Sequence, residues 1–170
     1  VALTAALNAH NDLIFSYAEG FRAPTFNDLY WPADPVFGAS SNPNLAPEKS
    51  KSYELQWRSQ LAEHTRLEAS IYRTDIHDLI AYVWNPATSE GLNYNVNEAR
   101  INGFEASLHQ QLLGWQGVLG LSVIDPRDRD SEHTLQRRAK QTLSLDIDRR
   151  IGNIGVGATW QTVSRRFDDA

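Results

Sequence analysis

The chain has 170 residues, 41% hydrophobic and 22% charged, which excludes a disordered composition. Its net charge of -5 argues against nucleic acid as a partner, because surfaces that bind phosphate backbones are normally basic. The sequence has no cysteine and no apolar run approaching the ~20 residues of a membrane-spanning helix, which excludes disulfides, thiolate metal sites and a helical membrane span.

Alternation of apolar and polar residues with a period of two is the main signal along the chain. From Tyr53 to Leu61 the odd positions are mostly apolar and the even positions are Glu, Gln, Arg and Gln. A helix would mix these two sets around its surface, whereas a strand separates them onto opposite faces. The pattern recurs from Gln141 to Asp148. In chain order, the predicted strands are 1–7, 12–21, 53–61, 65–84, 92–112, 116–125, 139–150 and 154–165.

The connections between these strands alternate between two kinds. Short turns are predicted at Asn8–Asp12, Ala62–His64, Leu113–Trp115 and Gly152–Asn153. Long polar connections are predicted at Arg22–Ser52, Asn85–Gly91 and Pro126–Arg138. Strict alternation of tight turns with long loops is typical of bacterial outer-membrane barrels, whose loops lie outside and whose turns lie in the periplasm. We therefore expect the long connections to gather at one end of the sheet.

The polar face of the predicted strands is strongly charged. It carries Glu54, Arg58, Glu68, Asp146 and Asp148. Burying such groups unpaired between two packed sheets would be very unfavourable, whereas a wide, wet lumen leaves them hydrated. The interior of a small barrel is filled by side chains, so we expect these strands to belong to a larger barrel.

The predicted fold is therefore all-β, an antiparallel transmembrane β-barrel with about eight strands in this chain. We expect Leu55, Trp57, Leu143 and Leu145 to point away from the lumen, and Glu54, Gln56, Thr142 and Asp146 to point towards it. The alternative is a soluble β-sandwich that binds a ligand, such as a carbohydrate, through aromatic loops. An enzyme has no supporting motif.

Three stretches of the chain carry a family resemblance. They are Tyr17–Pro24 with Asn27–Tyr30, Asn42–Ser50 with Tyr53–Glu54, and Tyr72–Ile80 with Tyr94–Glu105. In content, order and spacing they resemble the later barrel strands of TonB-dependent outer-membrane receptors. Within that family, Asn42–Ser50 and Arg137–Gln141 are most similar to the vitamin B12 (cobalamin) transporter branch, while siderophore receptors share close variants.

The resemblance implies energised uptake of a scarce solute, cobalamin or a ferric siderophore, across the bacterial outer membrane. It also implies that residues 1–170 are a C-terminal part of a barrel of about 22 strands surrounded by outer-membrane lipid. The plug, the TonB box and the C-terminal aromatic strand of such receptors are expected to lie outside this chain. The TonB complex would act through that separate N-terminal segment. No cofactor is expected.

Four aromatic residues are candidates for contact with the solute: Tyr30, Trp31, Phe37 and Trp84. They lie in or beside the long connections, and aromatic faces stack well on a flat ligand with hydrophobic edges. The competing interpretation places them in loop packing or in the aromatic girdle at the lipid headgroups, where Trp and Tyr are enriched in any barrel.

Other residues with possible chemistry favour structural roles. The acids of Asp125–Asp130 would suit calcium, but the order of a calcium-binding loop is missing and two arginines intervene, so we expect an outer loop with internal ion pairs. The histidines lack ligand spacing, and no catalytic residue is predicted. Gly103 within a strand indicates a bulge or the close approach of another backbone. Most residues of the three motifs are expected to shape strand ends and pack the barrel.

Overall fold

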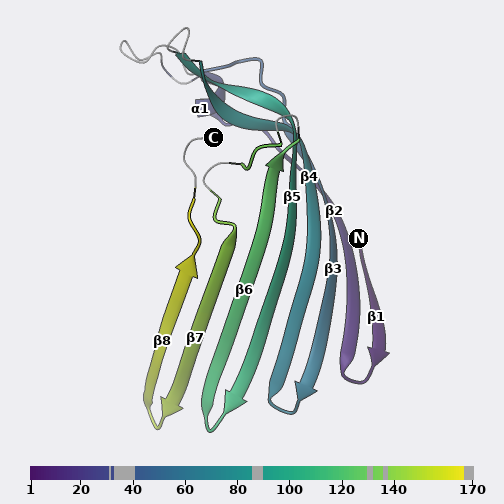
Figure 1. The fold of residues 1–170 in the computed structure, drawn as a ribbon, viewed down its shortest axis with the longest axis vertical. Coiled ribbons are helices and arrows are strands. Elements are labelled where there is room, and N and C mark those ends of the chain that lie inside the picture. Colours follow the sequence, from purple (N-terminus) through teal and green to yellow (C-terminus); the bar gives the residue numbers. More distant parts are fainter. Residues whose placement is uncertain (31, 33–40, 86–89, 130–131, 136–137, 167–170) are drawn as a thin grey trace.

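The computed structural model describes residues 1–30, 32, 41–85, 90–129, 132–135 and 138–166, which form a single curved sheet (Figure 1). All eight predicted strands are present, and each is antiparallel to the next, in the order β1 to β8. They are β1 (Ala2–Asn8), β2 (Asn11–Arg22), β3 (Glu48–Ala62), β4 (Thr65–Asn85), β5 (Glu90–Leu112), β6 (Trp115–Asp128), β7 (Gln141–Ile151) and β8 (Ile154–Val163). Among the described residues, no helix is long and apolar enough to span a membrane.

Two strands extend further than the alternation predicts. β3 begins at Glu48 instead of residue 53, and β6 continues to Asp128, so Pro126–Asp128 belong to a strand and not to the predicted loop. Apart from Pro126, the residues of both extensions are polar on the two faces, and the period-two signal disappears. The long connections are correspondingly shorter. The first contains an unpredicted helix, α1 (Phe26–Tyr30), which is too short to show a helical period.

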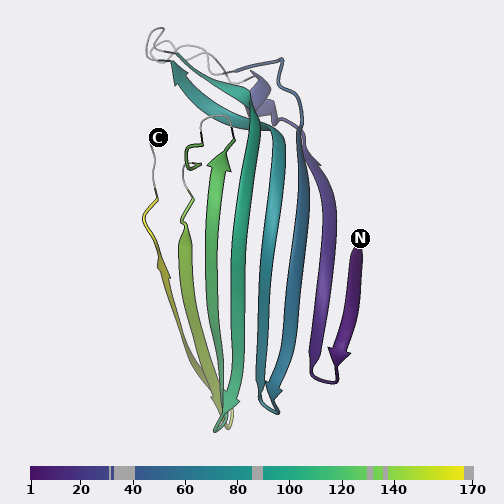
Figure 2. The same cartoon turned by 45° about the vertical axis from the view of Figure 1, so that its right-hand side comes forward.

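The two kinds of connection lie at opposite ends of the sheet, as predicted. The hairpin turns after β1, β3, β5 and β7 gather at the lower end in Figures 1 and 2, and the longer connections emerge at the upper end. We call the upper end the outer end, following the sidedness of outer-membrane barrels.

At the outer end, β4 and β5 continue beyond the other strands as a two-stranded ribbon, residues 79–96, which bends over the top of the sheet (Figures 1 and 2). At the start of the ribbon, Asp78 has a φ of 58°, which is uncommon for a residue other than glycine. Asp78 interrupts the ladder between the pairs His77–Glu98 and Leu79–Val96. Of the predicted connection Asn85–Gly91, the described residues Asn85, Glu90 and Gly91 belong to β4 and β5, and residues 86–89 lie outside the described residues.

The strand register confirms that the two predicted sets of residues lie on opposite faces of the sheet. Residues paired directly across a ladder share a face of the sheet. One continuous row is Trp57–Ala69–Ala106–Leu121–Leu143, and the adjacent row of the opposite face is Gln56–Ser70–Glu105–Ser122–Thr142. Leu55 and Leu145 lie on the first face, and Glu54 and Asp146 on the second.

The apolar face is not covered by other protein in the described residues. Ile71 is 57% exposed and Leu119 is 43% exposed, although both lie in the middle of long strands. A soluble β-sandwich would bury these side chains against a second sheet. The described residues contain one sheet, so the sandwich alternative is wrong.

Gly103 has a different role from the one predicted. The register of β5 is continuous through Gly103 on both sides, so there is no bulge. A Cβ atom at this position would collide with the ring of Tyr72, its partner on β4. The close approach is therefore that of an aromatic ring, not of another backbone.

Candidate functional site

The base of the first long connection is closed by Arg22 and Glu48, at the outer ends of β2 and β3. The Arg22 guanidinium donates to both carboxylate oxygens of Glu48, at 2.6 and 2.7 Å, and the backbone amide of Ile80 donates to one of them at 2.8 Å. The Glu48 side chain is only 12% exposed, so these hydrogen bonds replace the water that its charged oxygens would otherwise bind. One side chain thereby joins three strands.

Helix α1 is capped and docked through Asp28. Its carboxylate accepts hydrogen bonds from the amide and hydroxyl of Thr25, at 2.8 and 2.7 Å, and the Asp28 amide donates to the Thr25 hydroxyl at 3.1 Å. This reciprocal arrangement is a capping box. The Thr25 hydrogen bonds lower the pKa of Asp28. The other carboxylate oxygen accepts from the Asn93 side chain at 3.0 Å, which fixes α1 to the ribbon.

The segment 41–47 is held on the same ribbon by asparagine side chains. Asn42 donates to the Asn93 carbonyl at 3.0 Å. Asn95 accepts from the Ala46 amide at 2.8 Å and donates to its carbonyl at 2.9 Å. Leu45 between them is buried. These residues of the motif Asn42–Ser50 therefore have the structural role expected of them.

We call α1, the segment 41–47 and the ribbon 79–96 the outer platform; its parts lie close together above the sheet in Figures 1 and 2. Several aromatic side chains are exposed on it: Phe26, Tyr30, Tyr82, Trp84 and Tyr94. Of the four predicted candidates, Tyr30 lies in α1 and Trp84 in the ribbon, while Trp31 and Phe37 lie outside the described residues.

The two described candidates come from different elements and do not stack on each other. The ring of Tyr30 packs on Phe26, with centroids 5.2 Å apart. Trp84 shares a ribbon face with Tyr82, Asn93 and Asn95, whereas Tyr94 lies on the other face. The sequence prediction missed Phe26, Tyr82 and Tyr94; the alternation of Tyr82 and Trp84 along β4 was the available signal for Tyr82.

Aromatic residues also occur where a lipid-headgroup girdle is expected. Tyr17 and Tyr53 pair across β2 and β3 on the apolar side, with ring centroids 5.1 Å apart. They lie one row beyond Phe15 and Leu55 towards the outer end. At the turn end, the Arg149 guanidinium lies over Trp115, with its central carbon 5.8 Å from the centroid of the Trp115 ring. Tyr30 and Trp84 lie in other elements, α1 and the ribbon.

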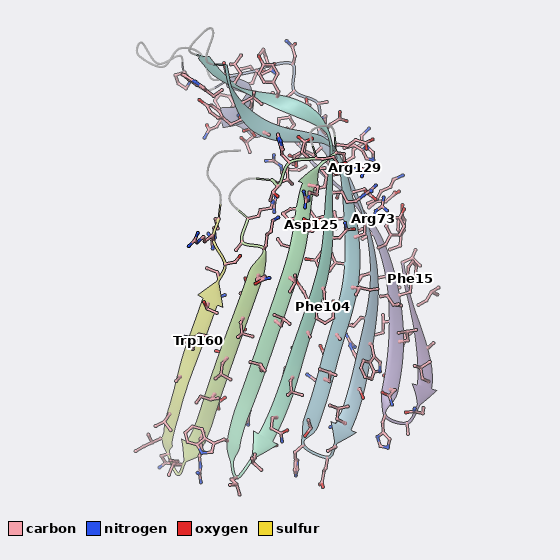
Figure 3. All side chains as sticks on the ribbon, in the orientation of Figure 1. Phe15, Arg73, Phe104, Asp125, Arg129 and Trp160 are labelled. Atoms are coloured by element: carbon pink, nitrogen blue, oxygen red, sulfur yellow. The ribbon has the colours of Figure 1, made fainter. Side chains whose placement is uncertain are left out.

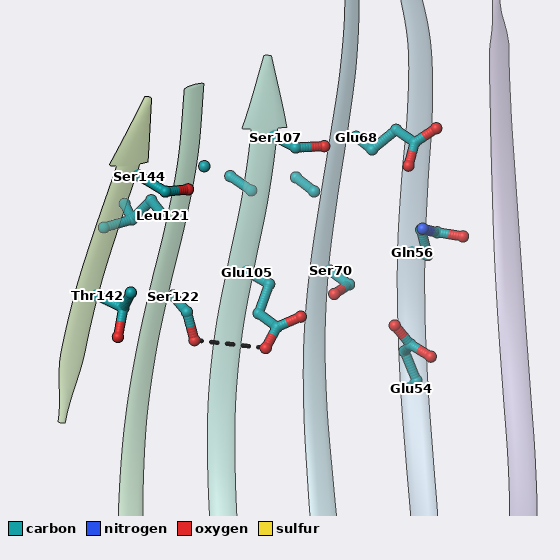
Figure 4. A pocket seen from close by; sticks show the side chains of 13 residues that line it. Glu54, Gln56, Glu68, Ser70, Glu105, Ser107, Leu121, Ser122, Thr142 and Ser144 are labelled. Atoms are coloured by element: carbon teal, nitrogen blue, oxygen red, sulfur yellow. Dashed lines mark hydrogen bonds between the residues drawn. The ribbon is translucent and has the colours of Figure 1, made fainter. Parts of the chain in front are cut away.

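The polar face forms a shallow pocket in the middle of the sheet (Figure 4). Glu54, Glu68 and Glu105 contribute carboxylates from three successive strands, with serine hydroxyls between them. Only one hydrogen bond joins the labelled side chains in Figure 4, from Ser122 to Glu105 at 3.4 Å. Such an open, hydrated wall suits a water-filled lumen.

Within Asp125–Asp130, the described residues Asp125, Arg127 and Arg129 form ion pairs, as expected, although the first part of the stretch is strand; Asp130 lies outside the described residues. Asp125 accepts from Arg127 at 2.8 Å and lies 3.9 Å from the Lys140 ammonium. Arg129 lies 3.7 Å from Glu132. Within the described part of the chain, no group of three or more acidic, histidine or cysteine side chains could hold a metal ion.

Comparison with known proteins gives consistent results. The family model for the β-barrel of TonB-dependent receptor-like proteins matches residues 2–170. The chain is 37% identical over 163 residues to the vitamin B12 transporter BtuB of Vibrio vulnificus, covering 92% of this chain and 24% of that protein. It is 34% identical over 158 residues to BtuB of Photobacterium profundum, with coverages of 89% and 24%. The chain spans about a quarter of the length of these curated relatives.

Solved structures show the same fold at lower identity. The copper transporter OprC superimposes with a TM-score of 0.75 and 20% identity, over 95% of this chain and 25% of that one. The ferric enterobactin receptor PfeA of Pseudomonas aeruginosa has a TM-score of 0.75 and 17% identity, over 97% and 27%. Since the family model matches nearly the whole chain and two relatives exceed 30% identity, the chain belongs to the TonB-dependent receptors and forms part of their β-barrel in the bacterial outer membrane.

Proposed function

We propose that the full-length protein takes up a cobalamin-type solute across the outer membrane, driven by the TonB complex. Residues 1–170 would supply part of its barrel domain, and the plug, TonB box and C-terminal strand would be supplied by other parts of the protein. The observation that carries the proposal is the 37% and 34% identity to two vitamin B12 transporters. The solved structures of the copper transporter OprC and of the siderophore receptors PirA and PfeA match at 17–20% identity, which supports the fold alone.

The outer platform is the part of this chain that we assign to solute capture. Its aromatic side chains are exposed, including Tyr30 at 54% and Trp84 at 47%. The elements that carry them are fixed by the hydrogen bonds that Asp28 and Asn95 accept and Asn42 donates, so little further ordering would be needed on binding. Aromatic faces suit a large flat ligand with hydrophobic edges.

The rival proposal within the family is a siderophore receptor. The two are distinguished by titrating the purified full-length receptor with cyanocobalamin and, separately, with ferric enterobactin. Cobalamin-type uptake predicts saturable binding of cyanocobalamin and none of the ferric chelate at the same concentrations. Binding of ferric enterobactin alone would replace the proposal with its rival.

The contribution of the outer platform is tested by a matched pair of aromatic variants in the same ribbon. Trp84→Ala should weaken cyanocobalamin binding about fivefold, the loss expected for one aromatic contact of ~1 kcal/mol. Tyr94→Ala removes an equally exposed ring from the opposite face of the ribbon and should leave the affinity unchanged. Equal effects of the two variants would remove the Trp84 face from the site.

A further inference from the structure

The apolar face of the sheet ends in a sharply defined charged zone at the outer end. The row Ile71–Phe104–Val123 is followed on the same face by Arg73–Asn102–Asp125 and then by Asp75–Arg100–Arg127. Successive rows on one face are two residues apart, about 7 Å along the strand. Figure 3 shows Arg73 and Asp125 beyond Phe104 in the direction of the outer end.

The side chains of these rows, together with Lys140, form two neighbouring ion-paired groups. Asp75 accepts from Arg73 at 2.8 Å and from Arg100 at 2.7 Å. Asp125 is paired with Arg127 at 2.8 Å and with Lys140 at 3.9 Å. We call these six residues, Arg73, Asp75, Arg100, Asp125, Arg127 and Lys140, the outer-face cation cluster.

The outer-face cation cluster has four cations and two carboxylates, a net charge of +2, in a chain whose net charge is -5. Its cations remain accessible: the side chains of Arg73, Arg127 and Lys140 are 46%, 40% and 36% exposed. A guanidinium has five N–H donors, so each arginine keeps donors free for an anion after binding a carboxylate.

The depth of the cluster is given by the aromatic pair on the same face. Tyr53 is the direct cross-strand partner of both Tyr17 and Arg73, so the paired tyrosines and the first cation, Arg73, share one row. Aromatic girdles lie at the level of the lipid headgroups. Long cationic side chains at this level extend their charge to the phosphates while their stems remain in apolar surroundings.

We propose that the outer-face cation cluster binds the phosphorylated headgroup of a lipid in the outer leaflet of the membrane. Asp75 and Asp125 hold the guanidinium groups in place, and the surplus of two positive charges attracts phosphate. Arginine recognises phosphate through paired N–H donors, which favours a fixed site over diffuse attraction. The lipid would bind on the outside of the barrel, so this inference is independent of the solute that the receptor carries.

The test uses the full-length receptor in phosphatidylcholine vesicles that contain lipid A with two phosphomonoesters, or the same lipid with both phosphates removed. Native mass spectrometry of the released receptor measures the retained lipid. We expect retention of the phosphorylated lipid only. The double variant Arg73→Gln/Arg127→Gln should lower retention about tenfold, because two charge-assisted contacts are lost.

The control variant is Arg66→Gln, which removes an exposed arginine from the same strand, β4, but on the opposite face. It should retain lipid like the unmodified receptor. Arg73→Lys/Arg127→Lys keeps the charge and should retain an intermediate amount, which separates lipid binding from misfolding of the Gln variant. Equal retention of the two lipids, or equal retention by the double Gln variant and the Arg66→Gln control, would overturn the proposal.

Discussion

Arg22 and Glu48 lie opposite each other across the β2–β3 ladder and are joined by two hydrogen bonds, 2.6 and 2.7 Å long. Each belongs to a different family motif, and the connection between them includes α1. Because Glu48 also accepts from the Ile80 amide, the pair fixes the base of this connection to the start of the ribbon.

The first prediction concerns this pair. Glu48→Gln removes the negative charge and one of the two oxygens that accept hydrogen bonds from Arg22. The free energy of unfolding should therefore fall by about 1–2 kcal/mol. Amide exchange at Ile80 should accelerate at the same time. Urea unfolding and hydrogen exchange of the full-length receptor measure both effects. Glu63→Gln, in an exposed turn, serves as the control and should change neither. Identical behaviour of the two variants would show that the pair does not anchor the connection.

The second prediction concerns pH. Hydrogen bonds from Thr25 hold the pKa of Asp28 below its ordinary value, with Arg22 nearby contributing in the same direction. The stabilisation from the ionised form is therefore complete above the ordinary pKa of about 4 and is lost as the pH falls through the lower folded-state value. The protection factor of the Thr25 amide, which is the exchange rate of an unstructured amide at the same pH divided by the rate at Thr25, should fall below about pH 4. Asp28→Asn should abolish this dependence; an unchanged acid response in that variant would contradict the assignment.

The third prediction concerns the contact between Gly103 and Tyr72. Gly103→Ala places a methyl group in the space of the Tyr72 ring and should destabilise the barrel by about 1–3 kcal/mol. Gly155→Ala is the control, because a Cβ there meets no atom within 4 Å. Combining Gly103→Ala with Tyr72→Ala should recover part of the loss. Urea unfolding checks all three variants, and equal stabilities of the two glycine variants would show that the ring contact is unimportant.

The fourth prediction concerns the two faces. Leu145 and Ser144 are neighbours on β7 that lie on opposite faces of the sheet. Leu145→Arg places a charge in lipid and should cost about 2–4 kcal/mol of folding free energy in vesicles, whereas Ser144→Arg enters the lumen and should cost much less. Folding titrations in lipid vesicles measure the difference. A larger cost for Ser144→Arg would reverse the assigned facing.

The parts of the fold that could be predicted from the sequence are those in which the membrane imposes a pattern on the residues. The eight strands and the facing of Trp57 and Leu143 could be predicted because lipid requires an apolar residue at every second position. Beyond the apolar band this requirement ends, so the first residues of β3, from Glu48 to Ser52, showed no alternation and were assigned to a loop.

Most of the outer platform could not be predicted from the sequence, for a different reason. Asn42 binds Asn93, 51 residues away, and Ala46 binds Asn95, 49 residues away. Contacts between residues so far apart in the chain leave no pattern in the local sequence, and α1 has too few residues to show a helical period. The motifs could be identified in the sequence. The hydrogen bonds by which Arg22, Glu48 and Asn95 connect them could not be predicted from it.

The central claim, that the outer platform captures a cobalamin-type solute, is tested most directly by calorimetric titration of cyanocobalamin into three proteins. These are the complete receptor, the receptor lacking residues 26–44, and the isolated chain. The complete receptor should bind tightly, and the deletion should weaken binding because it removes α1 and Asn42. The isolated chain should bind weakly or not at all, because a site shared among several segments loses its partners and must be ordered at an entropic cost. Unchanged affinity after the deletion would exclude this segment from the site, and tight binding by the isolated chain would contradict a shared site.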